Sequence, residues 1–210
     1  MIRYAITDRA RFPGDEAAHQ DALLRQADYL AGAGLEFLQI RERDVEPAVV
    51  TSLARKVLAT FRAHSPAPKL LINSRADVAI ACEADGVHLT SAEGSLTPAG
   101  VRQLYAATGL PEPVVSVSCH TLGEVAAARD SGADLILFGP VFEKVVFDAQ
   151  APLPADALIA EGTGLNLLRI VCAAAAPTPV LALGGITLEN TAACLAAGAA
   201  GIAAIRLFLD

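Results

Sequence analysis

The sequence predicts a (β/α)8 barrel, in which eight short parallel strands alternate with helices around one axis. Two observations favour this α/β fold. Eight apolar runs of strand length recur along the 210 residues, and between them lie stretches with apolar residues at i, i+3 and i+4 spacing. Strict alternation of this kind is typical of a parallel sheet, and eight units favour a closed barrel. An open doubly wound sheet is the alternative fold.

A weak internal repeat marks four of the strands. In each repeat, small residues precede an apolar run that is too short for a helix. Gly32, Gly132 and Gly198 lie where a preceding helix is expected to end, because glycine adopts the left-handed conformation there at little steric cost. The repeated segments are 31–40, 82–89, 131–139 and 197–205, and the other strands are expected at 3–7, 69–73, 114–118 and 179–183.

Four of the helices have clear sequence signals. Residues 16–31 and 47–64 carry apolar side chains at helical spacing. The helices over 121–131 and 187–197 each begin with a Thr followed by the polar residues of a capping box. Few residues follow the last strand, so the eighth helix is expected to be short or missing. We expect a single domain over 1–210.

Composition excludes several classes of protein. Hydrophobic residues make up 53% and charged residues 19% of the chain, which excludes disorder. The net charge is −7 and the basic residues form no run, so no nucleic-acid partner is expected. The first residues do not resemble a signal peptide, and the uncharged stretch 170–188 is interrupted by Pro and Gly. We expect a cytoplasmic protein outside the membrane, with its four cysteines as free, buried thiols.

Polar residues gather where the strands are predicted to end, which is where (β/α)8 barrels place their active sites. Strand alternation places Gln39, Arg41 and Arg43 on one face, and such side chains fit a polar mouth better than a helix-covered surface. We expect this face to bind an anion or a heterocycle. The alternative is that Arg43 lies beyond the strand, paired with a neighbouring carboxylate.

A glycine pair follows the seventh strand, at a position where barrels often bind phosphate through backbone N–H groups. Gly184 and Gly185 would let the backbone approach phosphate oxygens closely, and Arg206 would add a charge-assisted contact. A plain tight turn is the alternative interpretation.

Two histidines lie on predicted strands. His88 sits inside an apolar run, which favours a hydrogen-bonded structural histidine. His120 follows Ser118 at a strand end, and a histidine there suits proton transfer near neutral pH. No His-x-His or paired Asp lies at these strand ends, so the pattern itself does not favour a metal.

Seven motifs occur in order along nearly the whole chain: Tyr4-x-Ile-Thr-Asp8, Gln39-x-Arg41-Glu-Arg43-Asp44, Ile72-Asn73-x-Arg75-x-Asp77, Ala84-Asp85-Gly-Val-His88-Leu89, Ser118-x-His120-Thr121, Gly139-Pro-Val-Phe142 and Leu183-Gly-Gly-Ile-Thr187. Together they resemble the thiamine phosphate synthase family, which includes a thiazole tautomerase branch. The resemblance implies a (β/α)8-barrel enzyme of thiamin biosynthesis that binds a small phosphorylated heterocycle.

The synthases of that family join hydroxymethylpyrimidine diphosphate to thiazole phosphate and release pyrophosphate with Mg²⁺. The resemblance implies that Ser118 lies near the leaving group, and that His120 aligns with the acid/base histidine of the tautomerase branch. It implies a thiazole phosphate site at Gly184, Gly185, Ile205 and Arg206. The candidates for contact with the other substrate are Gln39, Arg41, Arg43, Asn73, His88 and Lys144.

Three departures from the family pattern affect the diphosphate and its metal. Ser74 stands where the family has a second carboxylate-bearing residue, so one Mg²⁺ ligand is missing. The family's second carboxylate for Mg²⁺ follows the His88-Leu89 motif, and here Glu93 is the residue that would replace it. The stretch after Phe142 lacks the family's Thr-x-Thr-Lys pattern, so Lys144 would have to act as a displaced cation.

Three functions therefore stay open. The first is a tautomerase-like enzyme that uses the phosphate loop and His120 and needs no cofactor. The second is a synthase that uses Mg²⁺ with Glu93 and Lys144. The third is a non-catalytic protein that binds a thiamin precursor. Residues 143–163 are expected to form one long loop, and the apolar end of the chain packs either on the barrel or in a homodimer.

Overall fold

Eight parallel strands form a closed barrel in the computed structural model, which describes residues 1–92, 94–146 and 158–209. The order around the barrel is β1-β10-β9-β6-β5-β4-β3-β2, and every neighbouring pair is parallel. The predicted (β/α)8 fold is thus confirmed and the open sheet is excluded. The barrel strands are β1 (Ile2–Ile6), β2 (Phe37–Ile40), β3 (Lys69–Asn73), β4 (Gly86–Thr90), β5 (Val114–Cys119), β6 (Leu135–Phe138), β9 (Val180–Leu183) and β10 (Gly201–Ala204).

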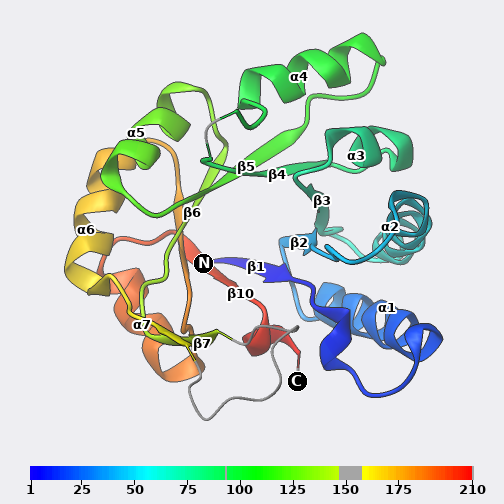
Figure 1. Cartoon of the computed structure of the whole chain (residues 1–210), viewed down its shortest axis with the longest axis horizontal. Coiled ribbons are helices and arrows are strands. Elements are labelled where there is room, and N and C mark those ends of the chain that lie inside the picture. The colour runs from blue at the N-terminus through cyan, green and yellow to red at the C-terminus, as the bar shows by residue number, and fades with distance from the viewer. Residues whose placement is uncertain (93, 147–157, 210) are drawn as a thin grey trace.

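Helices surround the strands as a ring (Figure 1). Both predicted capping boxes are present, since the side chains of Thr121 and Thr187 accept from backbone N–H groups three residues on. Within the described residues, no helix is both long and apolar enough to cross a membrane. The helices are α1 (Glu16–Gly32), α2 (Pro47–Phe61), α3 (Ala76–Cys82), α4 (Pro98–Ala107), α5 (Leu122–Asp130), α6 (Gly164–Ala175) and α7 (Leu188–Ala196), with 3-10 turns η1 (Arg9–Arg11) and η2 (Arg206–Phe208).

The short turn η2 occupies the place of an eighth helix, between α7 and α1 (Figure 1). Its Phe208 side chain is buried, and the Arg3 guanidinium lies 5.8 Å from the ring centroid. The Gln26 side chain of α1 donates a hydrogen bond to the Phe208 carbonyl. One turn therefore covers the gap, as expected for a short last helix.

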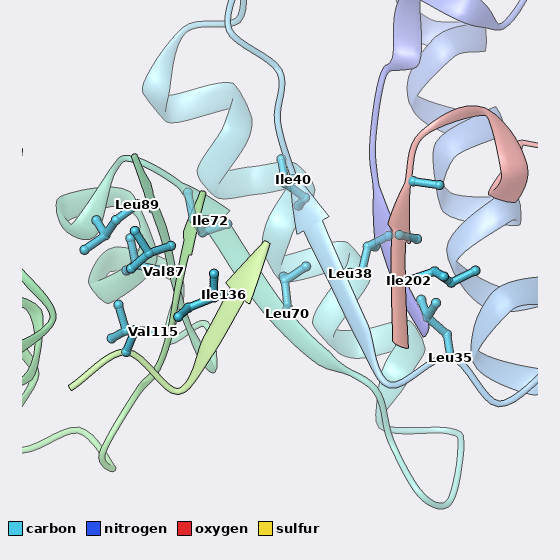
Figure 2. Close-up of a cluster of buried hydrophobic side chains, with 14 of the residues drawn as sticks. Leu35, Leu38, Ile40, Leu70, Ile72, Val87, Leu89, Val115, Ile136 and Ile202 are labelled. Carbon is cyan, nitrogen blue, oxygen red and sulfur yellow. The ribbon is translucent and has the colours of Figure 1, made fainter. Parts of the chain in front are cut away.

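The larger hydrophobic core lies between the strands and the helices. Outward-facing aliphatic side chains of successive strands form a continuous layer, part of which is shown in Figure 2. Burying a Leu, Ile or Val side chain contributes about 1.5–3 kcal/mol, so this layer is a main source of stability. The residues labelled in the figure are Leu35, Leu38, Ile40, Leu70, Ile72, Val87, Leu89, Val115, Ile136 and Ile202.

A second, smaller core fills the lumen of the barrel. Leucines from β6 and β9 and Ala203 of β10 fill one side, and Leu71 of β3 belongs to the same apolar cluster. The ring of Tyr4 of β1 also packs in this cluster, while its hydroxyl bonds to Gln39 and Ser116 on the opposite side. The opposite side is polar, because Gln39, His88 and Ser116 are also buried there. The lumen is thus divided into an apolar side from β6, β9 and β10 and a polar side that includes residues of β2, β4 and β5.

Two local predictions are wrong. The segment 143–163 is not one loop, because β7 (Lys144–Val146) and β8 (Leu158–Ala160) pair as an antiparallel hairpin. Helix α1 also continues through Gly32, and the left-handed residue after it is Gly34, with φ of 80°. Gly132 and Gly198 do adopt positive φ after their helices, as predicted.

The four cysteines are free, and all except the half-buried Cys172 are buried. Burial raises the pKa of Cys119 to about 12 and that of Cys172 to about 11. A raised thiol pKa lowers the fraction of the thiol that is present as reactive thiolate. For Cys119 at pH 8 this fraction is roughly 1 in 10⁴. We expect Ellman's reagent at pH 8 to label Cys172 slowly and the other thiols only after urea is added. Rapid labelling of all four thiols in the native protein, or of a Cys172→Ser variant, would contradict this expectation.

Candidate active site at the carboxyl end of the barrel

One rim of the barrel carries most of the predicted site residues. Because the strands are parallel and the barrel is closed, the residues that follow them share one end of the molecule. His88 lies deeper, in the lumen, with an exposed fraction of 6%. The residues at or next to the rim are Arg41, Asn73, Ser118, His120, Gly184, Gly185, Ile205 and Arg206.

Gln39 and Asn73 form the first pair of the site. Gln39 Nε2 donates to Asn73 Oδ1 at 2.8 Å, and Gln39 Oε1 accepts from the Tyr4 hydroxyl at 3.1 Å. The Gln39 side chain is only 1% exposed, so both contacts are made in the lumen. These contacts fix the orientation of both amides, and Asn73 Nδ2 then donates to Ser74 Oγ at 3.3 Å.

Arg41 is a half-buried cation at the rim. Its backbone N–H donates to Thr7 Oγ1 at 3.0 Å, which holds the chain just beyond β2. Burial lowers the pKa of Arg41, and the nearby charge of Arg43 lowers it further. Within the described residues, no hydrogen-bond or ion-pair partner of its guanidinium is found. An anion bound here would offset the unfavourable burial of this charge.

Arg43 does not share the face of Gln39 and Arg41. The strand ends at Ile40, and Arg43 lies in the following turn with an exposed side chain. The alternation of side-chain faces predicted for this strand therefore does not extend to Arg43. The predicted alternative is right in placing Arg43 beyond the strand. Its pair with a neighbouring carboxylate is not found among the described residues, where Glu42 and Asp44 bind Arg9.

Arg9 is the most important residue that the sequence pattern did not indicate. Its side chain is 8% exposed and forms ion pairs with Glu16 at 2.9 Å, Glu42 at 3.1 Å and Asp44 at 2.9 Å. Glu42 also accepts from Thr7 Oγ1 at 2.5 Å and from the Arg9 backbone N–H at 3.2 Å. This cluster ties the loop after β1 to the loop after β2, from which Arg41 projects.

Ser118 faces a buried hydrogen-bonded histidine. His88 Nε2 lies 2.7 Å from Ser118 Oγ, and His88 Nδ1 lies 2.8 Å from Ser116 Oγ. Burial lowers the pKa of His88 to about 3, with a further contribution from Arg41, so the ring is neutral near pH 7. Direct contact between His88 and a substrate is therefore not what the geometry indicates, since both ring nitrogens have serine partners.

His120 is exposed at the rim, and one of its two ring nitrogens is held in a hydrogen bond. Its Nδ1 is hydrogen-bonded to the Gly139 carbonyl, and a carbonyl can only accept, so Nδ1 carries a proton. In the neutral ring Nε2 is therefore unprotonated and available as a base. The backbone N–H of His120 donates to Glu124, the acidic residue of the capping box that Thr121 begins.

The glycine pair is built for close backbone packing. Gly184 and Gly185 have φ of 91° and 65°, and a Cβ on either would come within 2.6 Å of the segment after β6. The carbonyls of Leu183 and Gly184 accept from the N–H groups of Val141 and Phe142, at 2.8 and 3.1 Å. Within the described residues the N–H groups of the two glycines have no backbone acceptor, so they are available to an anion.

His120 and the glycine pair adjoin one another through Gly139. A Cβ on Gly139 would lie 2.0 Å from the Leu183 carbonyl oxygen, so the carbonyl that holds His120 belongs to a residue packed against the start of the glycine loop. Ile205 is half-buried and Arg206 is exposed directly after β10, the strand paired with β9.

The segment after β3 does not supply the carboxylate that the family pattern places there for Mg²⁺. Ser74 occupies the position of the missing carboxylate, and the nearby Asp77 is held by Arg75 in a two-bond ion pair. Glu93 lies outside the described residues. The backbone of Lys144 belongs to β7, but its side chain is outside the described part of the structure. Over the parts of the chain that are described, no cluster of three His, Cys, Asp or Glu residues could hold a metal ion.

Two cavities flank the barrel wall. The smaller, about 220 Å³, lies beside the rim between the segments after β2 and β3, and Arg43, Asn73 and Arg75 line it. The larger, about 370 Å³, is lined by residues of the β4–α4 segment and of α5. Of the predicted site residues, Arg43 and Asn73 line the smaller cavity, and the larger one is lined by Glu124, which binds the backbone N–H of His120.

A closed parallel barrel with the half-buried cation Arg41, an oriented histidine and a glycine loop at one rim defines the class of protein: a (β/α)8-barrel enzyme. The chain matches the family described as Thiamine monophosphate synthase over residues 3–208. A Geobacter sulfurreducens relative, provisionally named a thiamine-phosphate synthase, is 38% identical over 211 residues, which cover 98% of this chain and 85% of that protein.

Two further comparisons agree with this match. A thiamine-phosphate synthase from Methanoregula boonei is 33% identical over 203 residues, covering 96% of this chain and 82% of its own. The solved structure of a thiamine phosphate pyrophosphorylase from Pyrococcus furiosus superposes with a TM-score of 0.74 at 25% identity, covering 97% of this chain and 85% of that one. The chain belongs to the thiamine monophosphate synthase family.

Proposed function

We propose that this member of the family is an acid/base enzyme that isomerises a carboxylated thiazole phosphate. The observation that carries the proposal is the junction of His120 with the glycine loop through Gly139. A phosphate held by that loop brings the attached heterocycle next to the free Nε2 of His120.

Backbone geometry supports the proposed phosphate site. The N–H groups of Gly184 and Gly185 precede α7, whose positive helix end favours an anion. Arg206 follows the neighbouring strand and adds positive charge at the same rim. These groups would bind the substrate without taking part in proton transfer.

The chemistry requires one proton to move and no group to leave. Nε2 of His120 accepts a proton from one carbon of the substrate and returns a proton at another position, so the product has the composition of the substrate. The hydrogen bond from Nδ1 to the Gly139 carbonyl fixes the ring and keeps Nε2 directed away from that carbonyl.

A synthase is the second candidate, favoured by the names of the relatives and by the retained set of Gln39, Arg41 and Asn73. That reaction releases pyrophosphate, and Mg²⁺ would neutralise the developing charge. Ser74 supplies no carboxylate for that ion, and the nearby Asp77 is paired with Arg75. We therefore place the isomerisation first and the synthase second.

The two candidates differ in a simple assay. We expect the ultraviolet spectrum of carboxylated thiazole phosphate to change on incubation with the purified protein, at the same rate with and without EDTA. The synthase predicts instead that thiamine phosphate forms from hydroxymethylpyrimidine diphosphate and thiazole phosphate, and that EDTA stops it. Calorimetric binding of thiazole phosphate without conversion of either substrate would refute both and identify a binding protein.

A further inference from the structure

We infer that Tyr4, Ser116 and His88 set the hydrogen-bonding polarity of Ser118, so that its hydroxyl offers lone pairs and not a proton to a bound ligand. The four side chains come from three strands and meet in the polar side of the lumen. The inference concerns the proton order of this chain and does not depend on which reaction the enzyme catalyses.

The contacts form an unbroken series. The Tyr4 hydroxyl lies 3.1 Å from Gln39 Oε1 and 3.1 Å from Ser116 Oγ. Ser116 Oγ lies 2.8 Å from His88 Nδ1, and His88 Nε2 lies 2.7 Å from Ser118 Oγ. The two contacts of His88 have normal hydrogen-bond distances, and the two oxygen–oxygen contacts of Tyr4 are slightly longer than usual. Within the described residues no buried side-chain nitrogen or oxygen is left unbonded.

The direction of the series begins at Gln39. Its Nε2 donates to Asn73, so its Oε1 faces Tyr4 and must accept. The Tyr4 phenol has one proton, and burial raises its pKa, so the phenol stays protonated. It donates that proton in its hydrogen bond to Gln39 Oε1. Ser116 must therefore donate to the Tyr4 oxygen.

The same count determines the remaining protons. Because the only proton of the Ser116 hydroxyl is donated to Tyr4, Ser116 Oγ can only accept from His88, and His88 Nδ1 must be the donor. A neutral imidazole carries one N–H, and burial keeps His88 neutral. Nε2 is then an acceptor, and the proton of Ser118 must point to it.

The consequence is a hydroxyl with fixed polarity at the rim. Ser118 is half-buried, and its lone pairs are what remain for a ligand. It would accept from an amino group or a protonated ring nitrogen, and it would not donate to a phosphate oxygen. Reversing this order requires the Gln39 amide, all three hydroxyls and the His88 tautomer to change together, since any partial reversal leaves one contact in which two acceptors or two donors face each other.

The test is the tautomer of His88, measured by long-range ¹H–¹⁵N correlation on the whole ¹⁵N-labelled protein. His88→Asn identifies the His88 signals by their loss. We expect the wild-type ring to carry its proton on Nδ1. A ring with the proton on Nε2, or a charged ring at pH 7, would overturn the inference from the wild-type protein alone.

Two variants test the direction. Ser116→Ala removes the acceptor of Nδ1–H, so the His88 proton is expected to move to Nε2 and point to Ser118. Tyr4→Phe frees the Ser116 proton and is expected to give a mixture of tautomers. The matched control is Tyr105→Phe, since Tyr105 is a buried phenol bonded to the Ala84 carbonyl outside the lumen. An unchanged tautomer in Ser116→Ala would refute the assigned order, as would equal spectra for the two tyrosine variants.

Discussion

Replacing His120 with alanine is expected to lower kcat for the thiazole isomerisation by about 10² to 10⁴, the usual contribution of a positioned acid or base. The variant loses Nε2, the one base whose partner nitrogen is held next to the glycine loop. The phosphate site does not use the imidazole, so KM is expected to change little. Steady-state rates followed by the substrate's absorbance give both constants.

His64→Ala is the matched control for this variant. His64 is bonded to Asp28 through Nε2 at 2.8 Å and precedes β3, at the opposite end of the barrel from the rim. Its removal is expected to leave kcat within about twofold, since it holds no position near the reacting atoms. Equal kcat values for His120→Ala and the wild type would remove His120 from the mechanism.

Replacing Arg9 with methionine is expected to lower the free energy of unfolding by about 3–5 kcal/mol. Glu42 is only 8% exposed, and Arg9 is the only ion-pair partner of its carboxylate in the described residues. In the variant this carboxylate would stay buried without a compensating positive charge. Methionine keeps much of the volume of the arginine stem, so the loss reports charge pairing and not a cavity. Urea unfolding followed by circular dichroism measures it.

Arg75→Met supplies the comparison for Arg9→Met. Arg75 also forms a two-bond ion pair, with Asp77, but the two side chains are 48% and 65% exposed. Such surface pairs contribute about 0–1 kcal/mol, so the midpoint of unfolding should barely move. Losses of equal size in the two variants would show that burial of the Arg9 cluster is not what makes it stabilising.

The positions of the strands could be predicted because strands buried on both faces are short, continuous apolar runs bounded by turns. This signal is local, and each run kept its place in the closed barrel. The cap of α5 could be predicted for the same reason, since Thr121 and Glu124 are three residues apart. The rim followed from topology, once all strands were parallel.

Contacts between distant residues could not be predicted in the same way. Tyr4 and Ser116 are 112 positions apart, and nothing near either residue in the sequence indicates the other. Arg9 looks like an ordinary surface arginine after a strand, and its burial depends on carboxylates supplied by α1 and the segment after β2. Arg43 was misplaced because a two-residue alternation does not show where the strand ends.

The division of the lumen into an apolar and a polar side has a consequence for how this scaffold can diverge. The leucines of β6 and β9 and the outer layer hold the barrel together whichever polar groups stand opposite them. Exchanges among the lumen-facing polar side chains of β2, β4 and β5 therefore leave the outer apolar layer unchanged, provided that each buried polar group keeps a hydrogen-bond partner. After gene duplication, one copy could exchange a few of these side chains and acquire a new reaction while still folding as its ancestor did.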